Sequence, residues 1–198
     1  MTLPTRFNSN PFLQFSTWYQ DALKAKIGRP DAMVLATANL RAQPSARVVL
    51  FKGLSPEGIL FFTNYQSKKG QELAKNPNAA LVFYWPDLGR QIRIEGKVKL
   101  LSGDDSDLYW NTRPRESRLS ALASNQSRPI ASREILESKL KQLRIQNKGK
   151  EPSRPDHWGG YCLMPKSFEF WIEGKNRFHD RFLYSKKRQK WTFSRLAP

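Results

Sequence analysis

The sequence predicts an α+β fold in which an antiparallel sheet bends into a barrel and helices flank it. Five runs with strand-like composition follow one another closely, at residues 32–37, 46–52, 59–63, 79–85 and 91–101. Short turn signals separate several of them, for example Ser55-Pro56-Glu57-Gly58. Because short connections join antiparallel neighbours, whereas parallel strands need a crossover, this order disfavours a doubly wound fold.

The first helix is expected at residues 11–27, where large apolar side chains such as Phe15 and Trp18 recur at helical spacing. Asn10 is a candidate N-cap directly before Pro11. Four further helices are expected at residues 67–74, 104–112, 115–123 and 132–146. Pro114 should break the chain between the second and third of these.

The rest of the chain is expected to form a loop and three strands. Residues 148–156 are rich in Lys, Gly and Pro and predict an exposed loop. Strands are expected at residues 167–172, 181–184 and 191–194. With 198 residues, the whole chain is expected to form one domain, residues 1–198, in which residues 1–10 are flexible.

The composition is that of an ordinary globular protein, with 39% apolar and 26% charged residues. No apolar run is long enough to span a bilayer, and the N-terminus has no signal-peptide core. The single cysteine, Cys162, excludes an intramolecular disulfide and a cysteine zinc cluster. These features predict a cytoplasmic protein without a membrane partner.

The formal net charge of +17 suggests an anionic partner. Nucleic acid, a membrane surface and small anionic ligands all fit such a charge. The basic residues are scattered along the chain rather than gathered in one block, which favours small anionic ligands. A basic nucleic-acid-binding module stays as an alternative, supported by the charge and the 12% aromatic content.

Near the C-terminus, Arg177, His179 and Arg181 alternate with Phe178, Asp180 and Phe182. A period of two predicts a strand with three cationic or protonatable groups on one face. Their mutual repulsion indicates a bound anion.

Two more segments carry cations that lack an obvious counter-charge. Arg47 and Lys52 bound a strand-like run, and their five-residue offset would place them on opposite faces, at different anions or at different ends of one site. Lys68 and Lys69 stand at the expected start of a helix, where the helix dipole is already positive. A phosphate there would resolve the conflict.

Tyr109, Arg113 and Ser117 recur at intervals of four, as phosphate donors on one helix face could. Gln126 and Ser127 add polar donors in a loop. The sequence has no Gly-rich dinucleotide fingerprint, no Walker loop, no metal-binding histidine pair and no nucleophile elbow. Hydrolase and metalloenzyme functions are therefore disfavoured.

In this order and spacing the segments resemble the pyridoxamine (pyridoxine) 5′-phosphate oxidase family from about Pro11 to Pro198. The motifs that carry the resemblance include Phe62-Thr63-Asn64, Arg113-Pro114-Arg115-Glu116-Ser117, Trp158-Gly159-Gly160, Glu169-Phe170-Trp171 and Arg195-Leu196-Ala197-Pro198. The resemblance implies an FMN-binding split β-barrel, with Greek-key-like strand order, that forms a homodimer with FMN at the subunit interface.

The resemblance also implies which residues form the site. The implied FMN contacts are Arg47, Val48, Val49, Leu50, Phe51, Lys52, Phe62, Thr63, Lys68, Lys69, Gln91, Gln126, Ser127, Trp171 and Arg181. Among them, Arg47, Lys68 and Lys69 would meet the phosphate, and Gln91, Trp171 and Arg181 the flavin ring. The implied substrate contacts are Lys52, Tyr109, Arg113, Ser117, Arg177 and His179. The other tryptophans, Trp158 included, are expected in the core.

The implied reaction oxidises pyridoxamine or pyridoxine 5′-phosphate to pyridoxal 5′-phosphate, with O2 as electron acceptor and H2O2 as product. Arg177 and His179 would be the catalytic residues, and His179 would either orient the substrate or assist its deprotonation. A relative that oxidises another reduced ring compound, such as a phenazine precursor, is the alternative. A substrate without a phosphate would not need the four implied phosphate contacts, which are Lys52, Tyr109, Arg113 and Ser117.

Two departures from the family pattern bear on the expected affinities. Only ten residues precede the first helix, whereas family members often carry an additional segment that covers the substrate, so a weaker lid is expected. Lys68 stands where arginine is common, which keeps the charge and loses the bidentate fork.

Overall fold

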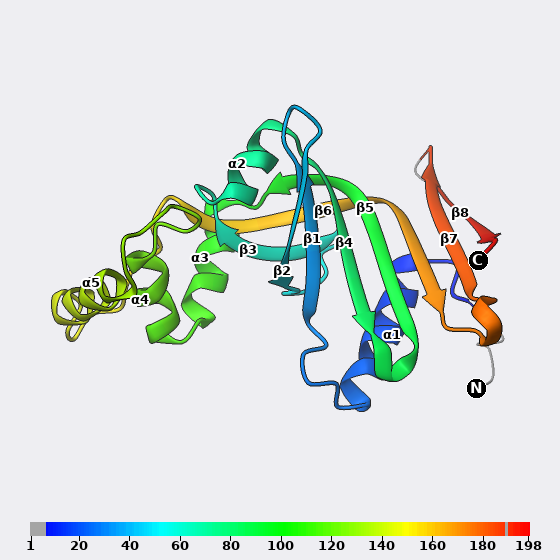
Figure 1. Ribbon diagram of the computed structural model, residues 1–198, viewed down its shortest axis with the longest axis horizontal. Helices are drawn as coiled ribbons and strands as arrows, with labels where there is room; N and C mark the ends of the chain where they lie inside the picture. Colours follow the sequence, from blue (N-terminus) through cyan, green and yellow to red (C-terminus); the bar gives the residue numbers. More distant parts are fainter. Residues whose placement is uncertain (1–6, 189) are drawn as a thin grey trace.

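The computed structural model describes residues 7–188 and 190–198. Its strands form one antiparallel sheet in the order β2-β1-β4-β5-β6-β7-β8, and β3 pairs with β6 outside this path (Figure 1). The strands are β1 (Ala32–Ala38), β2 (Pro44–Leu50), β3 (Ile59–Asn64), β4 (Asn78–Trp85), β5 (Arg90–Leu100), β6 (Trp158–Ile172), β7 (Asp180–Lys187) and β8 (Lys190–Leu196). The helices are α1 (Pro11–Lys24), α2 (Lys68–Lys75), α3 (Gly103–Thr112), α4 (Arg115–Ala123) and α5 (Arg133–Gln146), with short 3₁₀ turns η1 (Pro86–Leu88) and η2 (Lys175–Arg177). No helix in the described ranges is long and apolar enough to cross a membrane.

The long strand β6 joins two parts of the sheet. Its first half pairs with β3 and its second half with β7, while β5 follows it along almost its whole length. The β5–β6 register shifts at Glu95/Gly96, where a Cβ on Gly96 would lie 2.0 Å from the carbonyl oxygen of Met164. The sequence predicted this strand only from Ser167, because Pro165 interrupts the pattern; Pro165 is tolerated because it lies at the irregularity.

The sheet curls toward a barrel without closing it. Between β2 and β3 the chain contributes two backbone hydrogen bonds, from Lys52 N to Leu60 O and from Leu60 N to Gly53 O, both 2.9 Å. No continuous ladder joins the two strands in the described part of the chain, so the barrel is split. The predicted α+β class and split barrel are confirmed.

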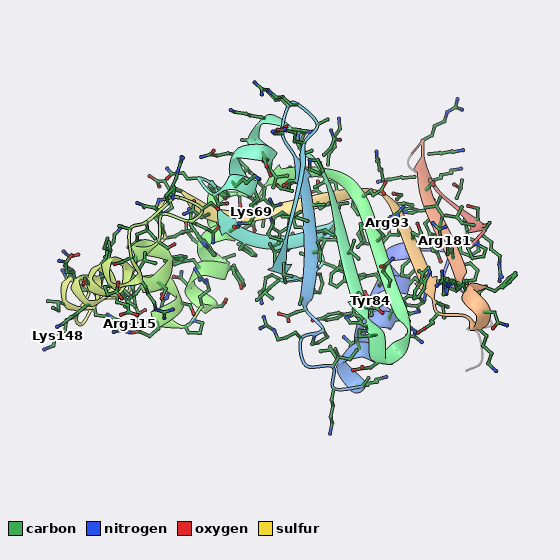
Figure 2. The ribbon with its side chains drawn as sticks, in the orientation of Figure 1. Lys69, Tyr84, Arg93, Arg115, Lys148 and Arg181 are labelled. Atoms are coloured by element: carbon green, nitrogen blue, oxygen red, sulfur yellow. The ribbon has the colours of Figure 1, made fainter. Side chains whose placement is uncertain are left out.

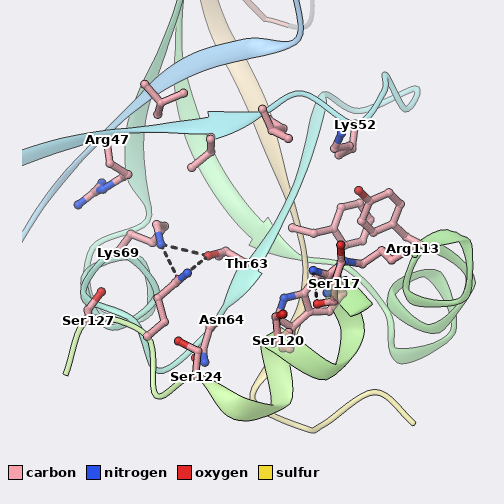
Figure 3. Close-up of a pocket in the computed structure, with 18 of the residues that line it drawn as sticks. Arg47, Lys52, Thr63, Asn64, Lys69, Arg113, Ser117, Ser120, Ser124 and Ser127 are labelled. Carbon is pink, nitrogen blue, oxygen red and sulfur yellow. Dashed lines mark hydrogen bonds between the residues drawn. The ribbon is translucent and has the colours of Figure 1, made fainter. Parts of the chain in front are cut away.

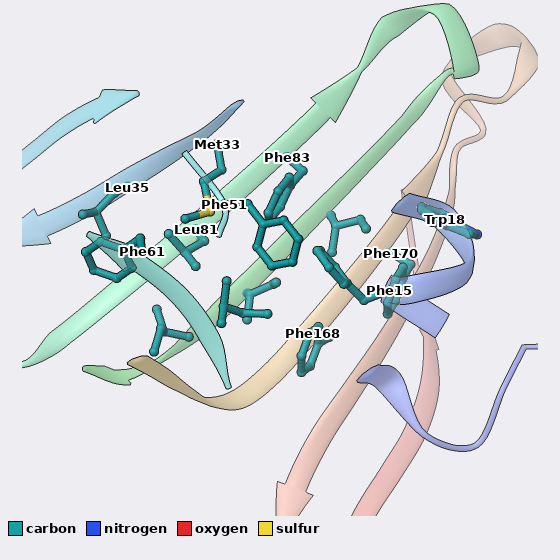
Figure 4. Close-up of a cluster of buried hydrophobic side chains, with 14 of the residues drawn as sticks. Phe15, Trp18, Met33, Leu35, Phe51, Phe61, Leu81, Phe83, Phe168 and Phe170 are labelled. Carbon is teal, nitrogen blue, oxygen red and sulfur yellow. The ribbon is translucent and has the colours of Figure 1, made fainter. Parts of the chain in front are cut away.

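Helix α1 covers the core at one open side of the barrel (Figure 4). Asn10 caps it by accepting from the backbone N–H of Phe12 at 2.9 Å. Phe15 and Trp18 are buried, and the Trp18 ring packs edge-on against Phe170. The helix ends at Lys24 rather than at Ile27, because Lys26 takes a left-handed φ of +54°.

At the N-terminus, Phe7 and Asn8 contact the sheet. The Phe7 and Phe182 rings lie 4.2 Å apart, and the Tyr184 hydroxyl donates to the carbonyl of Asn8 at 2.6 Å. These contacts join residues 7–10 to β7, and the flexibility expected for residues 1–10 stays a prediction. The rest of the segment predicted to be flexible, residues 1–6, lies outside the described residues.

Helices α3, α4 and α5 lie at the end of the molecule opposite the β7–β8 hairpin (Figure 1). The break predicted at Pro114 separates α3 from α4, and residues 148–156 form the predicted loop. The Trp110 ring N–H donates to the carbonyl of Pro152 at 2.8 Å, which ties this loop to α3.

Candidate active site

A cavity of about 1100 Å³ lies between β2, β3 and the helices α2, α3 and α4 (Figure 3). Cationic side chains occur at both of its ends: Arg47 and Lys69 at one, Lys52 and Arg113 at the other. The residues implied by sequence that line it are Arg47, Val48, Val49, Leu50, Lys52, Phe62, Thr63, Lys68, Lys69, Tyr109, Arg113, Ser117, Gln126 and Ser127. Phe51 is not among them, since its side chain packs in the core against Phe15 and Phe83.

Lys69 is a buried cation whose hydrogen-bond partners are neutral. Lys69 is only 7% exposed to solvent. Its Nζ donates to Gln126 Oε1 at 2.9 Å, Thr63 Oγ1 at 3.1 Å and Ser67 Oγ at 3.3 Å. Burial, and then the nearby positive charge of Arg47, lower the pKa of Lys69 to about 8. A buried ammonium of this kind indicates a site for an anion.

Arg47 is fixed by a network that the sequence analysis did not find. Its Nη1 donates to Leu35 O at 3.1 Å and to Thr37 Oγ1 at 2.6 Å. Its Nη2 donates to Ser45 Oγ at 2.6 Å and lies 3.3 Å from Glu72 Oε2. The guanidinium is therefore held at the edge of the cavity by β1, β2 and α2.

Glu72 is the buried carboxylate of this network, only 7% exposed. Burial raises the pKa of Glu72, but hydrogen bonds from Thr37 and Ser45 and the charge of Arg47 outweigh burial and hold the pKa below its usual value. Glu72 also follows Lys68 by four positions on α2, with Lys68 Nζ 4.0 Å from Oε1. The four-residue spacing from Lys68 was the only feature of the sequence that could have indicated that Glu72 belongs to this cationic end of the cavity.

At the opposite end of the cavity, the guanidinium of Arg113 makes cation–π contacts with two tryptophans. Its guanidinium lies 4.5 Å from the Trp158 ring centre and 5.1 Å from that of Trp110. Nη2 donates to Ser117 O at 3.0 Å, and buried Nη1 has no hydrogen-bond partner among the described residues. Burial lowers the pKa of Arg113. The orphaned donor is suited to an anion.

An aromatic stack forms the wall beside Arg113. The Phe62 and Tyr109 rings lie 3.8 Å apart at 20°, and the Trp158 ring lies nearly parallel to both, 5.8 Å from Phe62 and 6.2 Å from Tyr109. Trp158 was expected only to pack in the core. It is 6% exposed, yet it both lines the cavity and contacts the guanidinium of Arg113.

Lys52 and Arg47 line the same cavity because the strand does not continue to Lys52. Strand β2 ends at Leu50, so the opposite-face geometry predicted from a regular strand does not hold at Lys52. Lys52 Nζ lies 3.4 Å from Asp31 Oδ2. The two cations lie at different ends of one site (Figure 3). This was one of the two alternatives predicted from the sequence.

The other predicted site residues, Gln91, Trp171, Arg177, His179 and Arg181, lie outside this cavity and form what we call the β5–β7 cluster. Gln91, Trp171 and Arg181 are register partners across β5, β6 and β7. The His179 ring lies 4.6 Å from that of Trp171. Figure 2 shows Lys69 on α2 and Arg181 on β7, well apart in the same chain.

The strand predicted through Arg177 and His179 is wrong. Residues Lys175–Arg177 form the 3₁₀ turn η2, in which Asn176 and Arg177 have φ of +53° and +64°. β7 begins only at Asp180, so the three groups do not alternate along one strand. Gly174 makes the turn possible, because a Cβ there would lie 1.9 Å from the carbonyl oxygen of Phe178.

Together, a split barrel and a cavity with a buried cation at one end and a half-buried cation at the other define a protein that binds phosphorylated small molecules. The sequence matches the family profile described as pyridoxamine 5′-phosphate oxidase over residues 19–147, and that of the pyridoxine 5′-phosphate oxidase C-terminal dimerisation region over residues 158–198. This chain belongs to the pyridoxamine 5′-phosphate oxidase family.

Relatives named pyridoxine/pyridoxamine 5′-phosphate oxidase are similar over almost the full length. The protein of Paraburkholderia phytofirmans is 50% identical over 191 residues, 96% of this chain and 89% of its own, and that of Burkholderia mallei is 49% identical over 194 residues, covering 96% and 90%. PhzG from Burkholderia lata 383, solved with tetrahydrophenazine-1-carboxylic acid, is 31% identical with a TM-score of 0.92 and coverage of 96% and 94%. An FMN-binding protein from Nostoc punctiforme, 18% identical with a TM-score of 0.77 and coverage of 97% and 100%, shares the fold.

Proposed function

We propose that this protein is an FMN-dependent oxidase that converts pyridoxamine 5′-phosphate and pyridoxine 5′-phosphate to pyridoxal 5′-phosphate, with O2 as electron acceptor and H2O2 as product. Family membership and the relatives at about 50% identity support this function. The observation that carries the proposal is the pair of cations at separate ends of one cavity, the buried Lys69 and the half-buried Arg113. A phosphorylated cofactor and a phosphorylated substrate together need two such ends.

The residues at the α2 end fit the phosphate of FMN. Lys69 offers a buried ammonium with neutral partners, Arg47 is already oriented, and Lys68 stands at the start of α2. When bound, FMN supplies a ring whose N5 accepts a hydride equivalent from the C4′ carbon of the vitamer and which O2 reoxidises to give H2O2. In the β5–β7 cluster, Arg181 would place a positive charge near the flavin ring.

The residues at the Arg113 end fit the phosphate of the vitamer. The buried Nη1 of Arg113 has no described partner, and Lys52, Tyr109 and Ser117 line the same end. Held there, the substrate is positioned by its phosphate rather than by its reacting carbon, and positioning of this kind is a large part of catalysis.

We infer that the protein acts as a homodimer in which the β5–β7 cluster of one protomer completes the cavity of the other. The match over residues 158–198 to a dimerisation region supports assembly. One chain keeps the two groups of site residues apart. The outer sheet face also exposes apolar side chains beside the cavity, with Val48 65% and Val34 37% exposed and paired across β1 and β2. A second copy would cover them.

His179 is held as a hydrogen-bond donor. The backbone N–H of Gly174 donates to its Nδ1 at 3.2 Å, so the proton of the neutral ring is on Nε2. That atom can donate to an oxygen of the substrate, whereas it has no lone pair for accepting a proton. This favours the orienting role over the role of a base.

Affinity for FMN should fall above pH 8. Lys69 has a pKa of about 8 without an anion, so at higher pH it must take up a proton to bind a phosphate. Binding is expected to be strongest between about pH 6, where the phosphate becomes a dianion, and pH 8, and then to weaken by up to about tenfold per pH unit. Titrating the apoprotein with FMN at several pH values checks this. An FMN Kd that stays flat from pH 8 to 10 would contradict the assignment of Lys69.

Gly174→Ala should lower kcat/KM for either vitamer by at least about tenfold while FMN stays bound. The added Cβ would collide with the Phe178 carbonyl and displace the turn that carries Arg177 and His179. Steady-state kinetics and the flavin content of the purified variant measure both effects. Gly149→Ala, in the loop after α5 with a positive φ and nothing within 4 Å of its added Cβ, is the matched control. Equal kinetics in the two variants would contradict the role of the turn.

A second candidate is oxidation of a reduced phenazine precursor, which the similarity to PhzG favours. The Arg113 end argues against it, because a carboxylate such as that of the PhzG ligand has fewer acceptor oxygens than a phosphate, and Lys52, Tyr109, Arg113 and Ser117 all line this end. Higher identity to the pyridoxine/pyridoxamine 5′-phosphate oxidases points the same way.

The proposed function is tested by purifying the protein, recording its absorption spectrum and assaying both vitamers in air. A flavin spectrum with formation of pyridoxal 5′-phosphate and H2O2 is the expected result. Bound FMN without product from either vitamer would overturn the substrate assignment. Absence of flavin with steeply salt-dependent oligonucleotide binding would favour the nucleic-acid module. The cytoplasmic location and the single domain, residues 1–198, stay predictions; the continuous sheet supports the latter.

A further inference from the structure

We propose that Glu72 is a positioning residue that strengthens FMN binding by holding Arg47 toward the phosphate. This inference rests on the proposed function, since it assigns the α2 end of the cavity to FMN. Glu72 does not line the cavity, and its carboxylate is buried behind Arg47.

The carboxylate links α2 to residues of β1 and β2 that lie 35 and 27 positions earlier in the sequence. Its Oε2 accepts from Thr37 Oγ1 on β1 at 2.5 Å and from Ser45 Oγ on β2 at 2.7 Å. The same two hydroxyl oxygens accept from Arg47, at 2.6 Å each. Glu72 therefore orients both hydroxyls so that their lone pairs face the guanidinium, and it adds its own charge at 3.3 Å.

Without this carboxylate, the cations at this end of the cavity would repel one another. Arg47 lies close enough to Lys69 to lower the pKa of that lysine, and Lys68 is 4.0 Å from the other oxygen of Glu72. The side chain of Arg47 is 21% exposed and could turn into solvent if released. Glu72 offsets the repulsion and keeps Arg47 oriented before the phosphate arrives.

Two physical effects of Glu72 on an anion have opposite signs. As a bare negative charge it would repel a phosphate, so its neutralisation would tighten binding. As a positioning residue it preorganises Arg47, so its neutralisation would weaken binding. Burial and the two hydroxyl donors shield the carboxylate from the cavity. We therefore expect the second effect to dominate.

The test is a fluorescence titration of the full-length apoprotein with FMN and, separately, with riboflavin, which has no phosphate. Glu72→Gln is expected to raise the Kd for FMN about tenfold and to leave that for riboflavin unchanged. An FMN Kd that is equal to or lower than that of the wild type would overturn the inference. Equal weakening for both flavins would also overturn it, because it would indicate general damage to the fold.

A double-mutant cycle isolates the route through Arg47. In an Arg47→Met background there is no guanidinium to position, so adding Glu72→Gln should no longer weaken FMN binding and should tighten it slightly. Continued weakening in this background would contradict the assignment. Glu57→Gln, which neutralises an exposed carboxylate paired with Lys99 away from the cavity, is the control and should not change either Kd.

Ser45→Ala gives a second route if Glu72→Gln does not fold. It removes one donor to Glu72 and one acceptor from Arg47, and is expected to weaken FMN binding several-fold with riboflavin unchanged. An unchanged FMN Kd in Ser45→Ala would contradict the inference. Failure of the wild-type protein to bind FMN would instead overturn the proposed function itself, so the two failures are distinguishable.

Discussion

Replacing Lys69 by methionine is expected to raise the Kd for FMN by roughly 30- to 150-fold, which corresponds to about 2–3 kcal/mol. Methionine fills nearly the same volume, so the change removes a charge rather than a contact surface. The lost interaction is a charge-assisted hydrogen bond to a phosphate in a buried site, and such bonds are among the strongest in proteins. Fluorescence titration of the apoprotein measures the effect.

The same substitution should not destabilise the apoprotein. In the absence of an anion, burial disfavours the charged form of Lys69, which is why its pKa falls to about 8. Lys69→Met removes that cost, so the Tm of the apoprotein should stay equal or rise while FMN affinity falls. Lys75→Met, at an exposed position on the same helix, is the control and should change neither quantity. A Lys69→Met variant that binds FMN like the wild type would show that the phosphate lies elsewhere.

Arg177→Ala is expected to lower kcat/KM for both vitamers by about 100-fold or more and to leave FMN bound. Arg177 belongs to the β5–β7 cluster and extends from the turn η2, where its side chain is exposed in one chain. In the proposed dimer it would hold the substrate ring against the flavin, so its loss would act on positioning. Steady-state kinetics with both vitamers, together with the flavin-to-protein absorbance ratio, measure the two effects.

The left-handed backbone conformation of Arg177 is strained for alanine, so a second variant is needed to separate strain from loss of the guanidinium. Its φ of +64° lies in the left-handed region, which asparagine adopts more readily than alanine. Arg177→Asn therefore removes the guanidinium with less strain and should show the same loss of activity. Arg133→Ala, on the exposed surface of α5, is the control for loss of a surface arginine. Normal kinetics in Arg177→Asn would contradict a substrate role for the guanidinium.

Local sequence signals were sufficient for most of the fold. Asn10 and Pro11 mark the start of α1, and Pro114 separates α3 from α4, because capping and proline geometry act within a few residues. The strand predictions failed where an irregularity spans two strands. The first half of β6 could not be recognised, because Pro165 is acceptable only beside the bulge, where β6 has one extra residue, Lys166, opposite Glu95 and Gly96 of β5.

The residues that line the cavity could be predicted from the sequence better than those that position them. The cations and their likeness to a family pattern identified most of the residues that line the cavity. Glu72 and Trp158 were missed, because their roles depend on partners 25 and 45 residues away, Arg47 and Arg113, that only the fold brings near. Alternation at Arg177 and His179 was misleading, because a turn with two left-handed residues carries the same pattern as a strand.

In the proposed dimer, each FMN site combines the cavity of one protomer with the β5–β7 cluster of its partner. Mixing Lys69→Met and Arg177→Ala protomers tests it most directly, at an FMN concentration that saturates the wild type but not Lys69→Met. Each heterodimer would contain one site with both residues intact, so random mixing should restore about a quarter of wild-type activity from two impaired parents. Activity in the mixture that stays at the mean of the two parents would show that both groups act within one chain, and would rule out a site shared between protomers.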